Sequence, residues 1–219
     1  MRTYIDSADV EEVRHAHELG LVDGVTTNPS LVSSTDREYR DIIEELDEFV
    51  DGPISVEVIA TDYEEMLEEA REYDTWGENI AVKLPMTRDG MQALTTLSEE
   101  GIQTNITLIF SANQALIAAK NGATMVSPFI GRLDDIGHDG IALVEEIRTI
   151  YDNYGFETDI LAASLRHPKH VKDSAKAGAD IATLPTDVAE QLFDHPKTDS
   201  GLESFLADWG DRPSPALDK

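Results

Sequence analysis

The sequence predicts a single-domain (β/α)8 barrel that carries an extra helix at its C-terminus. Eight short stretches rich in β-branched residues alternate along the chain with amphipathic, helix-like stretches. Most of the strand candidates are continuously apolar, which is typical of parallel strands covered on both faces. The length of 219 residues suits one large barrel domain and is short for two complete domains.

The strand boundaries follow the apolar runs. The predicted strands cover residues 3–6, 24–29, 54–60, 80–85, 102–109, 124–130, 159–165 and 181–185. A doubly wound open sheet is the alternative, but the chain has no glycine-rich phosphate turn to support it. We expect the barrel and its C-terminal helix to span residues 1–210, and residues 211–219 to form a flexible tail.

Helix start and stop signals lie between these strands. Three Ser/Thr and Glu/Gln pairs have capping-box spacing: Thr35 with Glu38, Thr61 with Glu64, and Ser111 with Gln114. Gly122 and Gly178 suit helix C-termini, and Pro168 suits a first helical turn. Residues 186–196 and 200–209 are expected to form two further helices after the last strand.

The charge balance is strongly acidic. There are 17 Lys and Arg against 44 Asp and Glu, which gives a formal net charge of -27. This balance argues against a nucleic-acid partner, because phosphate backbones require a basic footprint. The acidic residues lie on helical faces, so we expect adaptation to a cytoplasm with molar salt, where screening over about 3 Å removes most self-repulsion.

The sequence also limits the location and the cofactors. No apolar run approaches the roughly 18 residues that a membrane span needs, and "MRTYIDSADV" is not an apolar signal segment. We therefore expect a cytoplasmic protein without a membrane partner. The absence of cysteine excludes thiolate metal sites and cysteine nucleophiles. The chain has no HExxH motif and its six histidines are scattered, so neither a metal nor another cofactor is predicted.

Within each predicted strand, the polar residues near the C-terminal end share one side-chain parity. Catalytic groups of barrel enzymes come from these strand ends, and alternate side chains point inward. The set, with Phe129 on the parity of Ser127, is Asp6, Thr26, Asn28, Ser55, Glu57, Lys83, Asn105, Thr107, Ser127, Phe129, Ser164 and Arg166. If this face points inward, one pocket contains two carboxylates, a lysine, two amides and several hydroxyls.

Each of these residues also has a purely structural interpretation. Asp6 suits the N-cap of a following helix, and Asn28 before Pro29 is a common turn pair. A lone Glu57 in a strand is more often at an exposed edge, and Lys83 could extend to water. The coincidence of such residues on one face of successive strands favours the catalytic interpretation.

Lys83 is the expected nucleophile. An unprotonated lysine can attack a carbonyl carbon, and burial in an apolar strand disfavours the charged form of an amine. The iminium formed with a ketone acts as an electron sink, which allows a carbon–carbon bond to break. Glu57 with Thr107 could shuttle protons through a water, and Asp6 could accept the proton of the hydroxyl at the breaking bond.

Two arginines near the ends of adjacent strands suggest a fixed anion. Arg132 and Arg166 present guanidinium groups suited to phosphate, and Ser164 could add a hydrogen bond. The alternative is that these arginines pair with neighbouring acids such as Asp134 and Asp135.

The chain resembles the transaldolase family, specifically its short subgroup shared with fructose-6-phosphate aldolase. The resembling segments run in family order from residue 4 to residue 185: YIDSADV, GVTTNPSL, SVEV, AVKLPMT, TNITLIFSANQA, VSPFIGRLDD, ILAASLRHP and ATLP. The resemblance implies a (β/α)8 barrel and a ping-pong reaction of the pentose phosphate pathway. In the implied reaction, a dihydroxyacetone unit passes from a ketose phosphate, such as fructose 6-phosphate or sedoheptulose 7-phosphate, to an aldose phosphate.

The resemblance also implies residue roles. Lys83 forms the Schiff base, Asp6 acts as acid and base at the bond that is cleaved, and Glu57 with Thr107 handles the catalytic water. The expected substrate-binding residues are Thr26, Asn28, Asn105, Ser127, Phe129, Arg132, Ser164 and Arg166.

Three positions favour the transaldolase branch over the aldolase branch. Glu57 and Phe129 resemble transaldolases, whereas the aldolase branch has Gln and Tyr there and lacks Asn105. A tyrosine hydroxyl could help protonate and release free dihydroxyacetone. A fructose-6-phosphate aldolase is therefore the alternative, followed by a non-covalent phosphosugar isomerase or binding protein.

Short members of this family form rings of five subunits that stack into decamers, with C-terminal helices reaching a neighbour. The predicted C-terminal helix carries one apolar stripe, formed by Leu202, Phe205, Leu206 and Trp209. The resemblance thus implies a homo-oligomer, either a pentamer or a decamer, although the stripe could equally cover its own barrel.

Overall fold

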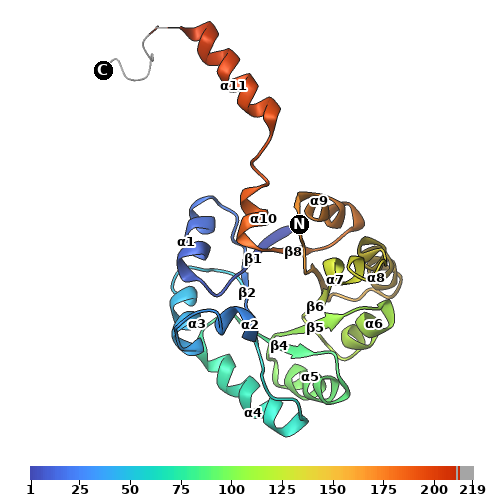
Figure 1. The fold of residues 1–219 in the computed structure, drawn as a ribbon. Helices are drawn as coiled ribbons and strands as arrows, with labels where there is room; N and C mark the ends of the chain where they lie inside the picture. The colour runs from blue at the N-terminus through green and yellow to red at the C-terminus, as the bar shows by residue number, and fades with distance from the viewer. Residues whose placement is uncertain (211, 213–219) are drawn as a thin grey trace.

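The computed structural model describes residues 1–210 and 212 and contains a closed barrel of eight parallel strands in sequence order (Figure 1). The strands are β1 (Arg2–Asp6), β2 (Val25–Thr26), β3 (Ile54–Glu57), β4 (Ile80–Pro85), β5 (Thr104–Ile109), β6 (Met125–Pro128), β7 (Asp159–Ala162) and β8 (Ile181–Leu184). The predicted (β/α)8 barrel is confirmed. The expected tail lies outside the described residues except for Arg212.

Helices follow the strands and form the outer layer (Figure 1). They are α1 (Val10–Glu18), α2 (Pro29–Val32), α3 (Tyr39–Asp47), α4 (Tyr63–Tyr73), the short 3-10 helix η1 (Asp74–Trp76), α5 (Arg88–Glu100), α6 (Ala112–Lys120), α7 (Ile130–Asp134), α8 (Gly140–Tyr154), α9 (Pro168–Ala177), α10 (Thr186–Glu190) and α11 (Pro196–Trp209). Within the described part of the chain, none of the helices has the length and apolarity that crossing a bilayer requires.

Two apolar clusters identify the inward parity of the strands. The larger cluster lies between the barrel and its helices, and the smaller one fills the barrel interior. The interior cluster includes Tyr4, Ala81 and Met125. Because side chains two residues apart share a face, Asp6 and Lys83 point into the same interior. On β1 to β6 the predicted polar face is therefore the inner face of the barrel. On β7 the interior side chains are those of Leu161 and Ala163, so the parity predicted for Ser164 and Arg166 is wrong.

Three of the predicted helix start and stop signals are confirmed. Ser111 and Gln114 form the predicted capping box at the start of α6. Pro168 lies in the first turn of α9, and Gly178 ends that helix with φ of 90°. A left-handed conformation of this kind favours glycine at a helix C-terminus.

The two other predicted capping boxes are wrong. Asp62, not Thr61, is the N-cap of α4 and accepts a hydrogen bond from the backbone N–H of Glu65. Aspartate ranks above threonine as an N-cap, which accounts for the shift by one residue. The Thr35 hydroxyl instead donates to the Val32 carbonyl at the end of α2. The start of α3 consequently has no side-chain cap.

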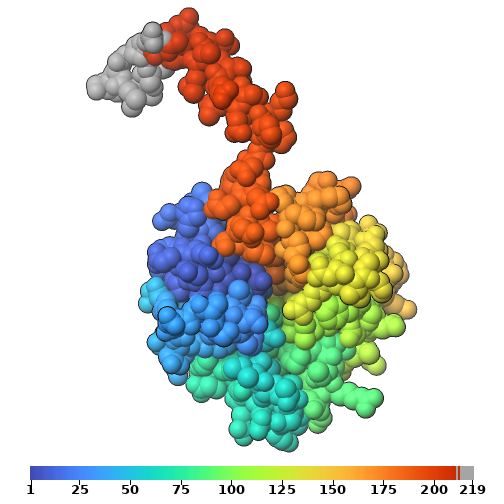
Figure 2. Space-filling model, in the orientation of Figure 1, coloured from blue at the N-terminus to red at the C-terminus, as the bar shows by residue number. Residues whose placement is uncertain are grey.

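The helix α11 extends away from the barrel and leaves its apolar stripe uncovered (Figures 1 and 2). Phe205 is 74% exposed and Leu206 is 62% exposed. The interpretation in which this stripe covers its own barrel is therefore wrong.

Candidate active site

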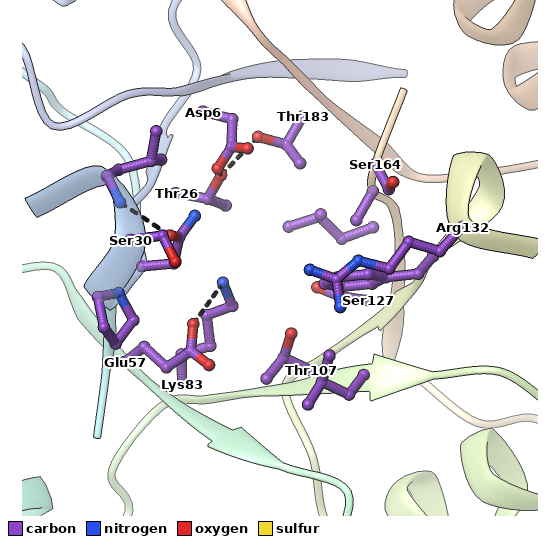
Figure 3. Close-up of a pocket in the computed structure, with 17 residues that line it drawn as sticks. Asp6, Thr26, Ser30, Glu57, Lys83, Thr107, Ser127, Arg132, Ser164 and Thr183 are labelled. Atoms are coloured by element: carbon purple, nitrogen blue, oxygen red, sulfur yellow. Dashed lines mark hydrogen bonds and ion pairs between the residues drawn. The ribbon is translucent and has the colours of Figure 1, made fainter. Parts of the chain in front are cut away.

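A cavity of about 520 Å³ opens at the C-terminal ends of the strands (Figure 3). This is the end of a barrel at which enzymes of this architecture place their active sites. Its lining residues are Asp6, Thr26, Asn28, Pro29, Ser30, Leu31, Glu57, Lys83, Thr107, Leu108, Ser127, Phe129, Arg132, Leu161, Ala163, Ser164 and Thr183. The structure thus brings together ten of the twelve predicted site residues and leaves Asn105 and Arg166 outside the wall of the cavity.

Lys83 is paired with Glu57 inside the barrel. The two residues lie opposite each other on neighbouring strands β4 and β3. The Nζ atom of Lys83 lies 2.9 Å from Oε2 of Glu57 and donates to the carbonyl of Thr27 at 3.2 Å. Lys83 is only 5% exposed, so it does not extend to solvent. Glu57 is thus in position to take the proton that the amine must lose before it attacks a carbonyl.

Tyr39, on α3, holds the strand segment that carries Glu57. Its hydroxyl accepts the backbone N–H of Glu57 at 2.9 Å and lies 2.7 Å from Oγ1 of Thr27. The Thr27 hydroxyl donates to the Ser55 carbonyl, so Tyr39 must be the donor in its bond to Thr27. Burial raises the pKa of Tyr39 well above its ordinary value, which keeps the phenol protonated for this role.

A chain of two hydroxyls fixes Asp6. Thr26 donates to Oδ1 of Asp6 at 2.7 Å, and the hydroxyl oxygens of Thr26 and Thr183 lie 2.6 Å apart (Figure 3). Because the single hydroxyl proton of Thr26 goes to the carboxylate, Thr183 must donate to Thr26. Asp6 is not a helix N-cap, since Asp9 caps α1. The carboxylate therefore faces the cavity with one oxygen held by the chain.

Asn28 lies at the start of a short helix on the edge of the cavity. Its side chain accepts the backbone N–H of Leu31 at 3.0 Å and so caps the short helix α2. It also lines the cavity, beside Ser30 and Leu31.

The residues of the cavity wall that were not predicted from the sequence include Ser30, Leu31 and Thr183. Thr183 has the strand parity of Ile181, which lies in the barrel interior, so the parity rule would have found it.

Asn105 lies beneath the cavity floor rather than on its wall. Its amide nitrogen donates to Oγ of Ser55 at 3.1 Å, and its oxygen accepts the Ser127 hydroxyl at 2.7 Å. This arrangement orients Ser127.

Among the described residues, the buried Thr107 hydroxyl has no hydrogen-bond partner although it lines the cavity. Such a group costs about 1–3 kcal/mol unless a water or ligand satisfies it, which makes it a candidate contact for either one.

The two predicted anion-binding arginines separate in the fold. The guanidinium carbon of Arg132 lies 4.9 Å from the ring centre of Phe129, and no carboxylate of the described residues is within ion-pair distance of it. Figure 3 shows it across the cavity from Lys83. Arg166 instead pairs with Asp135 at 2.8 Å, as the alternative interpretation expected. Of these two arginines, Arg132 lines the cavity and Arg166 does not.

The backbone is strained at two positions on the cavity wall. Leu108 has φ of 60° and Ser164 has φ of 59°, a region that side-chain-bearing residues rarely adopt. The pairing of β5 with β6 shifts register around Leu108. Strain of this kind concentrates at functional sites, where the surrounding fold maintains it.

The arrangement suits a hydroxylated carbonyl compound with an anionic end. It offers a buried amine beside a carboxylate, a second carboxylate on a neighbouring wall, several hydroxyls and a guanidinium. Across residues 1–210 and 212, no group of three or more His, Asp or Glu side chains is arranged to hold a metal ion.

Comparison with known proteins places the chain in a family. The family model described as Transaldolase/Fructose-6-phosphate aldolase matches residues 3–212. A protein of Methanococcus maripaludis (strain C7) is 57% identical over 95% of this chain and 97% of its own length. Proteins of Carboxydothermus hydrogenoformans and Geotalea uraniireducens are 56% and 58% identical over 95% of this chain and 98% of theirs. All three carry the name "probable transaldolase". The chain therefore belongs to the transaldolase/fructose-6-phosphate aldolase family and is an enzyme of transaldolase or aldolase type.

Proposed function

We propose that the protein is a transaldolase that transfers a dihydroxyacetone unit between phosphorylated sugars through a Schiff base on Lys83. The observation that carries this proposal is the buried amine of Lys83, which lies 2.9 Å from the Glu57 carboxylate and faces a cavity that also contains Asp6. The names of the relatives support the same activity.

In the first half-reaction, neutral Lys83 attacks the ketone carbon of a ketose phosphate. The carbinolamine loses its hydroxyl as water, with Glu57 supplying the proton, and an iminium results. Asp6 then accepts the proton of the hydroxyl at the fourth carbon. The bond between the third and fourth carbons breaks, an aldose phosphate leaves, and the bonding electrons move into the iminium to give a nucleophilic enamine on Lys83.

In the second half-reaction, the enamine attacks the aldehyde of an acceptor aldose phosphate, and Asp6 returns its proton to the new hydroxyl. Water then adds to the iminium and releases the ketose product. The unpartnered Thr107 hydroxyl and Glu57 both line the cavity, so they are suited to bind and deprotonate that water. Arg132 is suited to bind the phosphate by bidentate, charge-assisted hydrogen bonds.

Borohydride trapping tests this function. Wild-type protein is incubated with fructose 6-phosphate and borohydride in high-salt buffer, and its peptides are analysed by mass spectrometry. We expect a reduced dihydroxyacetone adduct on Lys83. If neither fructose 6-phosphate nor sedoheptulose 7-phosphate gives an adduct on folded protein, the covalent mechanism is wrong and the cavity performs non-covalent chemistry.

Phe129→Tyr is expected to raise the release of free dihydroxyacetone. Phe129 lines the cavity and contacts the Phe110 ring edge-on, with ring centres 5.7 Å apart. A hydroxyl added to this ring gives the cavity a proton donor that could quench the enamine before an acceptor arrives. An enzymatic assay for dihydroxyacetone, with and without an aldose acceptor, measures the partition. An unchanged ratio of release to transfer would remove the role assigned to Phe129, and Phe110→Tyr is the matched control.

We further propose a homo-oligomer in which α11 packs on a neighbouring subunit. The extended position of α11 and its exposed stripe of Leu202, Phe205, Leu206 and Trp209 support this assembly. Light scattering in high salt is expected to give the mass of a pentamer or decamer of the 24.1 kDa chain. A monomeric mass would contradict the proposal. Phe205→Glu places a charge on the stripe and is expected to dissociate the assembly.

Thermal stability is expected to rise with salt concentration. The net charge of -27 creates self-repulsion that dilute buffer leaves unscreened, and screening becomes effective over about 3 Å near molar salt. Thermal unfolding followed by circular dichroism from dilute buffer to molar KCl measures this effect. Equal melting temperatures across the series would contradict adaptation to a salt-rich cytoplasm.

A further inference from the structure

The helix that carries Arg132 is fastened to the end of β7 by its own backbone. The N–H of Ile130 donates to the Ala163 carbonyl, and the N–H of Gly131 donates to the Ser164 carbonyl, both at 3.0 Å. A Cβ atom on Gly131 would lie 2.2 Å from the Ser164 carbonyl oxygen. Only glycine permits this approach, so the start of α7 is fixed against the strained turn at Ser164.

The other end of α7 is held by Asp134. Its Oδ1 atom accepts the backbone N–H of Gly140, the first residue of α8, at 2.9 Å. Its Oδ2 atom lies 2.8 Å from Nε2 of His170 on α9. His170 is only 6% exposed. One carboxylate thus joins α7, α8 and α9 close to the arginine.

The hydrogen bonds of His170 define its tautomer. Its Nδ1 atom accepts the backbone N–H of Arg166 at 3.1 Å, so Nδ1 carries no proton. The proton therefore resides on Nε2 and is donated to Asp134. Burial lowers the pKa of His170, as do the neighbouring His167 and Lys169, whereas Asp134 opposes them. The imidazole is consequently neutral at neutral pH and bridges Asp134 to the backbone that follows Ser164.

We propose that Asp134 and His170 are positioning residues that hold Arg132 at the anion-binding end of the cavity. Neither residue lines the cavity, and each acts through the segments it joins. A fixed guanidinium loses little conformational entropy when it binds an anion. This inference rests on the proposed binding of a phosphorylated sugar. It adds that anion affinity depends on a neutral histidine and a carboxylate outside the cavity.

Asp134→Asn tests the pair with almost no change in shape. If the new amide oxygen accepts from His170, its NH2 group faces the N–H of Gly140, donor against donor. If the NH2 group faces His170 instead, Nε2 must become an acceptor, and the proton moves to Nδ1 opposite the N–H of Arg166. Either orientation breaks one bond of the network, so we expect anion affinity to fall about tenfold, the effect of losing one charge-assisted hydrogen bond.

The probe is inorganic sulfate, a tetrahedral dianion whose charge stays constant between pH 5 and 8, and its binding is measured by isothermal titration calorimetry. Asp173→Asn is the matched control, because it also removes one negative charge but lies on α9 in an ion pair with Lys169. We expect Asp134→Asn to weaken sulfate binding and to raise the KM for fructose 6-phosphate, with kcat nearly unchanged. Borohydride trapping of unphosphorylated dihydroxyacetone on Lys83 should proceed as in wild type.

The outcomes separate the two proposals. If Asp134→Asn weakens sulfate binding but no ketose phosphate forms an adduct on Lys83, the positioning role of Asp134 is supported and the proposed Schiff-base reaction is refuted. If borohydride traps an adduct on Lys83 but Asp134→Asn and Asp173→Asn bind sulfate with equal affinity, the positioning role of Asp134 is refuted. Absence of sulfate binding by wild-type protein also overturns the positioning role.

A second pair of variants covers the case in which Asp134→Asn fails to fold. His170→Gln keeps a donor that can reach Asp134, whereas His170→Ala keeps neither contact. We expect Gln to retain more sulfate affinity than Ala, and equal affinities would overturn the proposal. In wild type, sulfate binding should weaken as acid protonates His170, because Nδ1–H then opposes the N–H of Arg166. His167 and Lys169 also face this ring, so the acid transition must be absent in His170→Gln.

Discussion

Lys83→Met is expected to abolish transfer activity and adduct formation. Methionine has a similar volume but no nucleophile, so the rate should fall by at least about a thousandfold. The measurements are transfer from fructose 6-phosphate to an aldose acceptor and borohydride trapping of the variant. Both signals should vanish together, because the Lys83 amine is the only protein group that bonds to the ketone carbon in the proposed mechanism.

Stability must be measured alongside activity, because Lys83→Met leaves the Glu57 carboxylate without its partner. Removing one member of a buried ion pair typically costs about 3–5 kcal/mol, although Glu57 still has partial access to the cavity and hence to water. Thermal unfolding establishes that the variant is folded under assay conditions. Lys120→Met, at the exposed end of α6, is the matched control and should keep full activity. Adduct formation on folded Lys83→Met would refute the assignment.

Asp6→Asn is expected to separate Schiff-base formation from bond cleavage. Asparagine fills the same space and its oxygen can accept the Thr26 hydroxyl, but it cannot take a proton from the substrate. General-base catalysis typically contributes about 10² to 10⁴ in rate, so we expect cleavage of fructose 6-phosphate to slow by about a thousandfold. The same variant should still form a trapped adduct with dihydroxyacetone on Lys83, since that step uses Glu57.

The matched control for Asp6→Asn is Asp9→Asn. Asp9 caps α1 outside the cavity, and asparagine is an equally good N-cap, so this variant should be fully active. Single-turnover kinetics with fructose 6-phosphate separate the two steps directly. If Asp6→Asn cleaves as fast as Asp9→Asn, another group is the base. If Asp6→Asn instead loses adduct formation as well, Asp6 acts at the Schiff-base step.

The barrel and the grouping of polar side chains on one face of a strand could both be predicted from the amino-acid sequence. Both are local properties. A buried parallel strand needs a continuous apolar run, and side chains alternate strictly along it, so Ser55 had to share a face with Glu57, and Asn105 with Thr107. Which of the two faces points inward is shown by the interior cluster, in which Tyr4, Ala81 and Met125 have the parity of the polar residues on their strands.

The partner of each polar group could not be predicted, because it depends on how distant segments pack together. Arg132 and Arg166 look alike in the sequence, yet Arg132 lines the cavity whereas Arg166 pairs with Asp135. The contacts of Thr183 with Thr26, and of Tyr39 with Glu57, join residues far apart in the chain.

The position of α11 was also beyond the reach of the sequence. Its apolar stripe indicates that one face of the helix packs against another surface, but an amphipathic pattern does not identify that surface. Periodicity is a property of neighbouring residues, whereas pairing across the barrel depends on where distant segments come together. The sequence therefore predicted which side chains share the polar face of each strand, and the closed fold decided how each group on it is held.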